Sequence, residues 1–287
     1  EIYTGDTSSA ASDVYKRQPG DTRIGAAMNI EIHGTGRAAG ALAISAARAG
    51  HRVVGIHGRG GAVNPYGSLV TVADGDPDLR IIAVSDRAIR SVAGSLTAAE
   101  PVPTVHVSGA EPVSALDSIA DRAPVGSFHP LQTLPTPEAG ANRLPGAWVG
   151  ITAEPPLDAL LFAFAESMGC TPFHLSDDRK AIYHAAAAAV ANFPLASFAI
   201  AADLYEQAGV PFEAARPLLD AIVANAFDLG PREALTGPIA RGDVETVSKQ
   251  VGAVRSEAPD LAEAFLRFAR ATADIAGVSD EFEQVLR

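Results

Sequence analysis

The sequence is poor in cysteine and in basic residues, and each scarcity excludes a class of protein. Cys170 is the only cysteine among 287 residues, so the chain cannot form an internal disulfide, which is typical of a reducing cytoplasm. Lysine and arginine number 22 against 34 acidic residues, which gives a formal net charge of −12. Because so acidic a surface repels phosphate backbones, we expect no nucleic-acid partner. The single cysteine leads us to expect a cytoplasmic protein.

The sequence also lacks the spacings of metal sites and the features of a signal peptide. None of its seven histidines falls at HxH or HExxH spacing, so we expect no metal site. No basic start leads into an apolar core, as a signal peptide would require. The most apolar window, residues 181–204, is long enough to cross a membrane but consists mostly of alanine and contains polar residues and Pro194. We interpret this window as a helix buried inside the protein and expect no membrane partner.

The first 27 residues differ from the rest of the chain. They show no hydrophobic periodicity and precede a methionine that stands directly before the first predicted strand. We expect residues 1–27 to be a non-native or disordered leader, with Met28 as the natural start.

The remaining chain changes character near residue 176. Before it, short runs rich in β-branched residues alternate with helical segments, whereas residues 177–287 read as almost pure helix, including one long helix over 178–208. We predict an α/β fold, with a doubly wound parallel Rossmann-like sheet in residues 28–176 and an all-α domain in residues 177–287. Strands are expected at 29–33, 51–57, 79–85, 103–109, 124–130, 146–152 and 170–176.

A glycine-rich turn follows the first predicted strand. The segment Gly34-Thr35-Gly36-Arg37-Ala38-Ala39 reads GxGxxA, a variant of the dinucleotide fingerprint, in the strand–turn–helix context that the fingerprint requires. Gly34 permits the tight turn, Gly36 lets the backbone approach a pyrophosphate, and the helix N-terminus offers N–H groups to it. We predict that residues 34–38 bind a dinucleotide. The alternative is a nucleotide-free domain that keeps the glycines for packing.

The end of the second predicted strand indicates which dinucleotide is bound. A carboxylate about 20 residues past the glycines would hold the ribose 2′-hydroxyl of NAD. No acidic residue occurs from His51 through Ala73. Arg59 could instead bind a 2′-phosphate, with His57 as a second donor, so NADP is the predicted cofactor. Alternatively, Arg59 is only a solvated surface residue.

Several further motifs resemble a known family when taken together with the glycine turn. The segments are GTGRAAG (34–40), AVSDRAI (83–89), HVSGAEP (106–112), GSFHPLQT (126–133), DRKAIYHAAAAAVAN (178–192) and ALTGPIARGD (234–243). They resemble a family of unknown function that joins a Rossmann-like domain to a helical C-terminal domain. That family is related to ketopantoate reductase, pyrroline-5-carboxylate reductase and the β-hydroxyacid dehydrogenases, and the resemblance runs from about Met28 to the C-terminus.

The resemblance implies an NADP-dependent reductase fold and a homodimer formed largely through the helices. Val84, Ser85 and Asp86 would then line the nicotinamide side of the pocket, at the carboxyl end of a strand, and Ser108 would lie likewise after the next strand. We also expect Asp86 to cap the helix that follows it.

Lys180 is the first candidate for catalysis, because a reductase must polarise a C=O or C=N bond and deliver a proton. It opens a strongly apolar helix, where an ammonium is costly unless it faces a cleft. His184 and Asn192 lie 4 and 12 residues further, so one helix face would carry Lys, His and Asn. The related β-hydroxyacid dehydrogenases and ketopantoate reductases use a lysine at this point. The alternatives are a solvated Lys180 and a His184 that is an ordinary core histidine.

His129 and a polar loop near residue 240 complete the predicted site. His129 ends a predicted strand before Pro130 and is interpreted as a proton donor or substrate anchor, or else as a structural histidine. Thr236 and Arg241 are predicted to bind substrate, and Arg241 could pair with a carboxylate, with Asp243 or with the dimer partner. Asp243 is a predicted helix N-cap.

The predicted activity is NADPH-dependent reduction of a small 2-oxo acid, similar to that of ketopantoate reductase. Reduction of a cyclic imino acid, as by pyrroline-5-carboxylate reductase, is the alternative within enzymes. A catalytically silent dinucleotide-binding regulator or scaffold is the alternative outside them.

Overall fold

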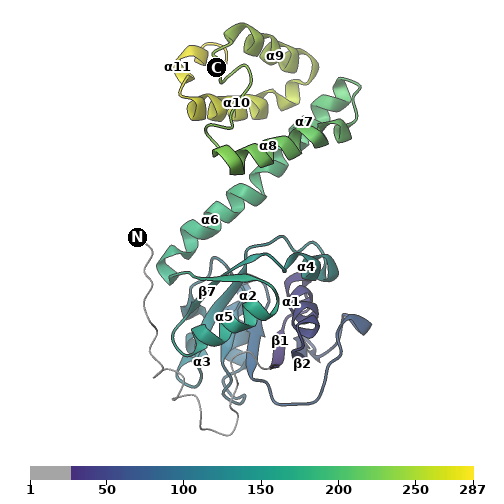
Figure 1. Cartoon of the computed structure of the whole chain (residues 1–287), viewed down its shortest axis with the longest axis vertical. Helices are drawn as coiled ribbons and strands as arrows, with labels where there is room; N and C mark the ends of the chain where they lie inside the picture. The colour runs from purple at the N-terminus through teal and green to yellow at the C-terminus, as the bar shows by residue number, and fades with distance from the viewer. Residues whose placement is uncertain (1–26) are drawn as a thin grey trace. The chain divides into compact units, whose positions relative to one another are not determined.

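The computed structural model describes residues 27–287, so the predicted leader lies, apart from Ala27, outside the described residues. The chain divides into two compact units, one ending at Ala187 and the other spanning Ala188–Arg287 (Figure 1). The break falls inside helix α6 (Lys180–Ala191), later in the chain than the domain boundary predicted after residue 176.

The first unit is built on an eight-stranded sheet with the order β3-β2-β1-β4-β5-β6-β7-β8. The strands are β1 (Asn29–His33), β2 (Arg52–Gly58), β3 (Gly61–Ala62), β4 (Leu79–Ile82), β5 (Thr104–His106), β6 (Val125–Pro130), β7 (Trp148–Ala153) and β8 (Thr171–His174). The predicted doubly wound sheet is confirmed, but β2–β3 and β6–β7 pair antiparallel. The first exception follows from the two-residue turn between β2 and β3, because such a turn can join only antiparallel strands.

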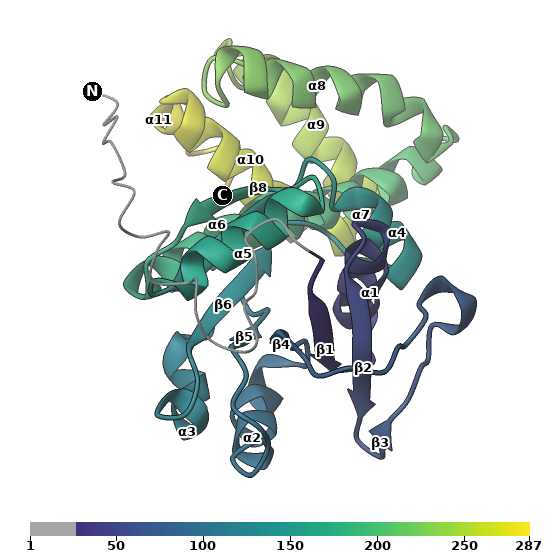
Figure 2. The ribbon, with the colours of Figure 1, turned by 60° about the horizontal axis from the view of Figure 1, so that its bottom comes forward.

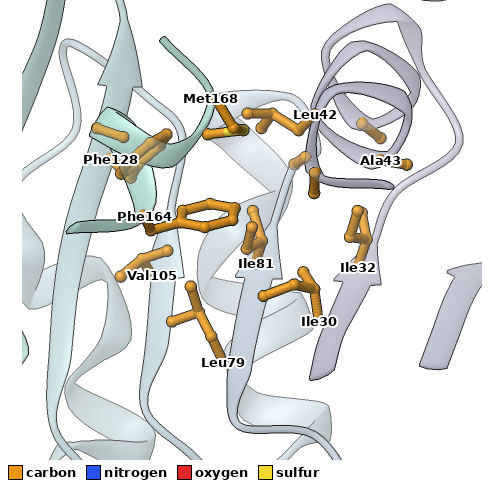
Figure 3. Packing of buried hydrophobic residues seen from close by; sticks show 14 of the residues in the cluster. Ile30, Ile32, Leu42, Ala43, Leu79, Ile81, Val105, Phe128, Phe164 and Met168 are labelled. Carbon is orange, nitrogen blue, oxygen red and sulfur yellow. The ribbon is translucent and has the colours of Figure 1, made fainter. Parts of the chain in front are cut away.

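One face of the sheet carries the main hydrophobic core (Figure 3). Ile30 and Ile32 point to this face and are fully buried, as the period of two along a strand requires. Their neighbours Leu79 and Ile81 on β4 lie in register beside them. The helices that supply residues to this core are α1 (Arg37–Arg48), α4 (Pro137–Arg143) and α5 (Leu157–Ser167).

The opposite face carries a smaller core under α2 (Asp86–Ser95) and α3 (Asp117–Ala120), which lie side by side (Figure 2). Ile82 of β4 packs there against Ile89 and Leu116. The predicted cap of α2 is wrong by one residue: Ser85 occupies the N-cap position and Asp86 is the first helical residue. Asp86 still lies in the first turn, where the helix dipole favours a carboxylate.

The second unit is helical, as predicted. Its helices are α7 (Phe193–Gln207), α8 (Arg216–Leu229), α9 (Val244–Glu257), α10 (Ala262–Ala276) and α11 (Ser279–Phe282). The core of this unit comes from α9, α10 and α11, with Val251, Leu266 and Phe282 among its members. The predicted N-cap at Asp243 is confirmed, since its carboxylate accepts a hydrogen bond from the Thr246 amide at 3.0 Å.

The long apolar helix differs from its prediction in two ways. The single helix expected over 178–208 is interrupted at Asn192, and Pro194 lies in the first turn of α7, where its missing N–H is tolerated. Asp177–Gln207 is long and apolar enough to cross a membrane by length and composition. None of its most apolar window is buried within the described chain, so the predicted burial is wrong. The reason is that the core of the second unit forms on other helices.

Candidate functional site

Gly34 is required at the turn between β1 and α1. Its φ is +138°, a backbone conformation that favours glycine, and its amide donates to the His57 carbonyl oxygen at 2.9 Å. A Cβ at this position would lie 2.1 Å from the Ala83 carbonyl oxygen. The turn therefore lies in direct contact with the residues at the ends of β2 and β4, and position 34 has no room for a residue larger than glycine.

Gly36, in contrast, has free space where a side chain would be. It is the N-cap of α1, its backbone is extended, and among the described residues nothing lies within 4 Å of a built Cβ. Thr35, Gly36 and Arg37 are exposed, and Ala38 is half-buried. The first turn of α1 holds no acidic residue. The exposed N–H groups of this helix N-terminus therefore form a site that suits a phosphate or pyrophosphate.

The two predicted ligands of a 2′-phosphate, His57 and Arg59, lie at the end of β2 and in the turn after it. Arg59 is exposed in the turn after β2, as a 2′-phosphate ligand should be. His57 directs its Nε2 to the Glu31 carboxylate, 3.0 Å from Oε1, so its predicted role as second donor would fall to Nδ1. Glu31 lies on β1 beside Gly55 of β2. Because it precedes the glycine turn in the sequence, the absence of acidic residues after the turn does not reveal it.

Glu31 belongs to a charged group of side chains that we call the Glu31 cluster. Arg80 is buried on β4 and hydrogen-bonds Glu31 Oε2. Burial raises the pKa of Glu31, but interactions with His33 and Arg80 outweigh it and lower the pKa to about 2. The members of the Glu31 cluster are Glu31, His33, His57 and Arg80.

The residues predicted beside the nicotinamide lie where parallel strands end. Val84 is half-buried after β4, and Ser85 and Asp86 are exposed at the start of α2. Ser108 is buried after β5, and its hydroxyl accepts hydrogen bonds from the amides of Ala110 and Glu111 at 3.2 and 3.0 Å. Ser108 thus shapes the loop that follows β5, at the edge of the sheet where ligands bind in such folds.

Lys180 is buried in this same region. Its side chain is only 2% exposed, so the alternative of a solvated residue is wrong. Its Nζ donates to the Glu111 carbonyl oxygen at 2.8 Å and lies 3.6 Å from Asp177 Oδ1. Burial lowers the pKa of Lys180 to about 8, against the partial compensation of Asp177. The group therefore changes protonation close to neutral pH, as a proton donor should.

His129 contacts the same helix as Lys180. Its Nδ1 is 2.9 Å from the Tyr183 hydroxyl, and Gly109 lies so close that a Cβ there would be 2.7 Å from the His129 ring. Burial, followed by the charges of His184 and Lys180, lowers the pKa of His129 to about 4. Burial also raises the pKa of Tyr183 to about 12. Both groups are neutral at pH 7, and His184 lies exposed beside them with its ring centroid 6.2 Å from that of His129.

Sequence reasoning did not assign a role to His106 or to Tyr183. His106 is fully buried on β5, and its Nδ1 accepts a hydrogen bond from the Ser108 amide at 3.2 Å. Burial, followed by the charge of Lys180, lowers its pKa to about 3. Its Nε2 has no hydrogen-bond partner among residues 27–287. With two neighbours these groups form the Lys180 cluster, which consists of His106, His129, Lys180 and Tyr183.

The other predicted site residues belong to the second unit. Asn192 is exposed between α6 and α7, and its amide donates to the Ala188 carbonyl oxygen at 2.8 Å, so the helical turn that carries Lys180 and His184 continues through Asn192. Pro194, which has no N–H to donate, lies in the first turn of α7 directly after this point. Thr236 and Arg241 are exposed in the loop between α8 and α9.

Comparison with known proteins supports the architecture. Residues 147–272 match the family model described as "Domain of unknown function (DUF2520)". This match bears out the predicted resemblance to a family of unknown function. No protein of curated function matches the chain significantly.

Solved structures are similar over most of the chain. A protein from Bacteroides fragilis, described provisionally as an NADP oxidoreductase, is 22% identical with a TM-score of 0.70, covering 88% of this chain and 100% of that one. Protein TM1727 from Thermotoga maritima is 20% identical with a TM-score of 0.60, covering 85% and 98%. A reductive aminase from Aspergillus terreus, in complex with NADPH and ethyl-5-oxohexanoate, is 18% identical with a TM-score of 0.59, covering 90% and 100%. These similarities confirm the Rossmann-like fold with a helical C-terminal part.

Proposed function

We propose that the protein is an NADPH-dependent reductase of a small carbonyl or imine compound. The observation that carries this proposal is the open N-terminus of α1 at Gly36, next to the turn that holds Arg59. A Cβ at Gly58 would lie 3.2 Å from Thr35, so the glycine turn and the start of the Arg59 turn are neighbours. Pyrophosphate at the helix and 2′-phosphate at Arg59 fit this arrangement. The NADP and NADPH named for two of the similar structures agree with it.

Bound NADPH would supply the hydride, and the chain would supply the proton and the orientation. We propose Lys180 as the proton donor, because its pKa of about 8 keeps Nζ protonated at neutral pH yet close to release. Neutral His129, held through Nδ1 by the Tyr183 hydroxyl, would present its Nε2 to the substrate oxygen or nitrogen. Ser108 and the residues Val84, Ser85 and Asp86 would border the nicotinamide.

A small 2-oxo acid remains the first choice of substrate. We propose that His184, which lies exposed beside the Lys180 cluster, contacts this substrate. Reduction of a C=N bond, as in a cyclic imino acid, is the second candidate, and the similar fold of a reductive aminase favours it. A silent dinucleotide-binding regulator would keep the glycine turn but turn over no substrate.

Cofactor binding tests the first half of the proposal. We expect NADPH to bind more tightly than NADH by calorimetry, and Arg59→Ala to remove the difference because only NADPH carries the 2′-phosphate. Gly36→Ala should weaken both, since its methyl group would occupy the approach of the pyrophosphate while the backbone remains unstrained. Gly94→Ala, at another glycine with free space, is the matched control. Equal affinity of the wild type for NADPH and NADH would contradict the proposed cofactor.

Turnover tests the second half. A screen of 2-oxo acids and cyclic imino acids, followed by NADPH absorbance, should find a substrate that Lys180→Met no longer reduces although it still binds NADPH. Tight NADPH binding without turnover of any compound would favour the silent regulator.

We also propose that the protein is a cytoplasmic homodimer, assembled through the second unit without a membrane partner. Large apolar side chains are exposed on α7 and α8, among them Phe193, Leu195, Ile222 and Phe227, the last 84% exposed. An apolar surface of this kind is typical of an obligate interface between subunits. Sedimentation equilibrium should give twice the chain mass, and Phe227→Glu should give the monomer. A monomeric wild type would contradict the assembly.

A further inference from the structure

Three potential metal ligands meet at the carboxyl ends of β1 and β2. Glu31 and His33 are two residues apart on β1, so their side chains share one face of the sheet, opposite to Ile30 and Ile32. His57 stands beside His33 in the parallel register. The three residues are half-buried, and the ligand atoms that they offer all lie within 4.8 Å of one another.

The shortest approaches join both imidazoles to one carboxylate. His57 Nε2 is 3.0 Å from Glu31 Oε1, and His33 Nε2 is 3.6 Å from Oε2. The two rings stack with centroids 4.7 Å apart and planes 16° apart, and both direct their Nε2 atoms toward the glutamate. Two imidazole nitrogens and a carboxylate form a ligand set that zinc enzymes use, with the fourth position left to water.

The nitrogen of His33 also lacks a partner. Its Nε2 is buried, yet among the described residues no atom forms a hydrogen bond with it, and 3.6 Å from Glu31 is too long for one. A buried polar atom without a partner is costly and requires an explanation, such as a bound water or ion. An ion between His33, His57 and Glu31 would satisfy this nitrogen.

We propose that Glu31, His33 and His57 bind a divalent transition metal ion of the zinc type. Nitrogen ligands favour zinc and its neighbours over magnesium or calcium, which prefer oxygen. Binding requires the stacked rings to tilt so that each Nε2 lone pair points at the ion. His57 can do so most readily, because its side chain is 30% exposed and the second side-chain torsion of histidine is soft.

Arg80 does not prevent this coordination. Its guanidinium donates a hydrogen bond to Glu31 Oε2, so Oε1 is available to bind the ion. A charged partner on the other oxygen of a ligating carboxylate also fixes the orientation of that ligand. The ion would tie β1 to β2 directly below the glycine turn. It would lie apart from the Lys180 cluster, because β4 separates His33 from His106, a span of about 10 Å at normal strand spacing.

Cobalt and zinc titrations of untagged, EDTA-treated protein test the site without any cofactor present. We expect one Co²⁺ per chain with the visible absorbance of a low-symmetry site, displaced by Zn²⁺, and a rise in Tm with either ion. His33→Gln and His57→Gln should each weaken the affinity by about tenfold or more. His174→Gln, at an exposed histidine on β8, is the matched control.

Three outcomes would overturn the site. They are no binding of Co²⁺ or Zn²⁺ by the wild type, unchanged affinity in both the His33 and His57 variants, and equal loss in the His174 control. Circular dichroism of each variant without metal shows whether it is folded. If one glutamine variant fails to fold, the other and their common control still decide the result.

Discussion

Two clusters of titratable side chains lie on the same face of one sheet, and the chain stabilises them in opposite ways. His33 of the Glu31 cluster and His106 of the Lys180 cluster stand in register on either side of Ile82. In the Glu31 cluster, a carboxylate with a pKa of about 2 stays charged against a buried guanidinium. In the Lys180 cluster, burial lowers the pKa values of two imidazoles and an ammonium instead.

The difference shows that close partners outweigh burial at Glu31, whereas burial outweighs the Asp177 carboxylate at Lys180. Arg80 is buried, as His106 is, but has a carboxylate beside it. His106 and His129 have no carboxylate within hydrogen-bonding distance among residues 27–287, so the neutral imidazole is favoured. A charged cluster suits structure or ion binding, whereas near-neutral donors suit proton transfer.

Removing one charge from the Glu31 cluster should have the largest effect. Arg80→Leu leaves Glu31 without its cation in a half-buried site, and we expect a loss of about 4 kcal/mol in the free energy of unfolding. The double variant Glu31→Leu with Arg80→Leu should recover most of this loss, because an apolar pair replaces the ion pair.

Urea unfolding measures both variants. Arg87→Leu, at an exposed arginine of α2, is the control and should change the free energy by less than about 0.5 kcal/mol. A loss as small as that of the control in Arg80→Leu would show that the ion pair does not hold the cluster.

The sequence predicts one of these clusters far better than the other. Lys180 and His129 stand out locally, one as a charge opening an apolar helix and the other as a strand-ending His-Pro, and the structure brings both to the same region. The Glu31 cluster was not predicted, because its members come from three strands and meet only through the register of the sheet. That register shifts at a bulge between Ile30 and Glu31. The alternation of polar Glu31 and His33 with isoleucines was the available signal, since it marks a polar face of a strand otherwise expected to be apolar.

Secondary-structure propensity predicts which elements form, whereas tertiary contacts decide which helices are buried. The glycine turn and all described strands except the two-residue β3 were predicted correctly, because they follow from β-branched runs and from the conformation that Gly34 adopts. Burial of the helix at 181–204 was not, because alanine-rich sequence is compatible with both a core and an exposed face. Only the placement of the core on α9, α10 and α11 distinguishes the two.

The pH dependence of stability tests the Lys180 cluster. Folding lowers the pKa of Lys180 from 10.5 to about 8, so between these values the unfolded chain binds more protons than the folded one. Stability due to Lys180 therefore rises as pH increases through this window, by an amount that approaches about 3 kcal/mol at its upper end. The difference in unfolding free energy between the wild type and Lys180→Met isolates this contribution from other titrations.

The matched control for that difference is Lys249→Met. Lys249 is 73% exposed and pairs with Glu245 on α9, so its substitution should give a difference that does not rise across the window. A flat difference for Lys180→Met as well would mean that its ammonium is not destabilised by burial, and the contrast between the clusters would fail.

The smallest expected effect concerns the hydrogen bond between His129 and Tyr183. Tyr183→Phe removes the hydroxyl that satisfies Nδ1, at a cost of about 1 kcal/mol in the free energy of unfolding. Tyr205→Phe, at a half-buried tyrosine whose hydroxyl has no partner in the described chain, is the control and should cost less. A double-mutant cycle with His129→Gln separates the pair from other losses, because a coupling energy near zero would show that the hydroxyl does not hold His129. If the coupling is present, the Tyr183 hydroxyl holds the His129 ring through Nδ1 in the Lys180 cluster, whichever of the two groups donates the hydrogen bond.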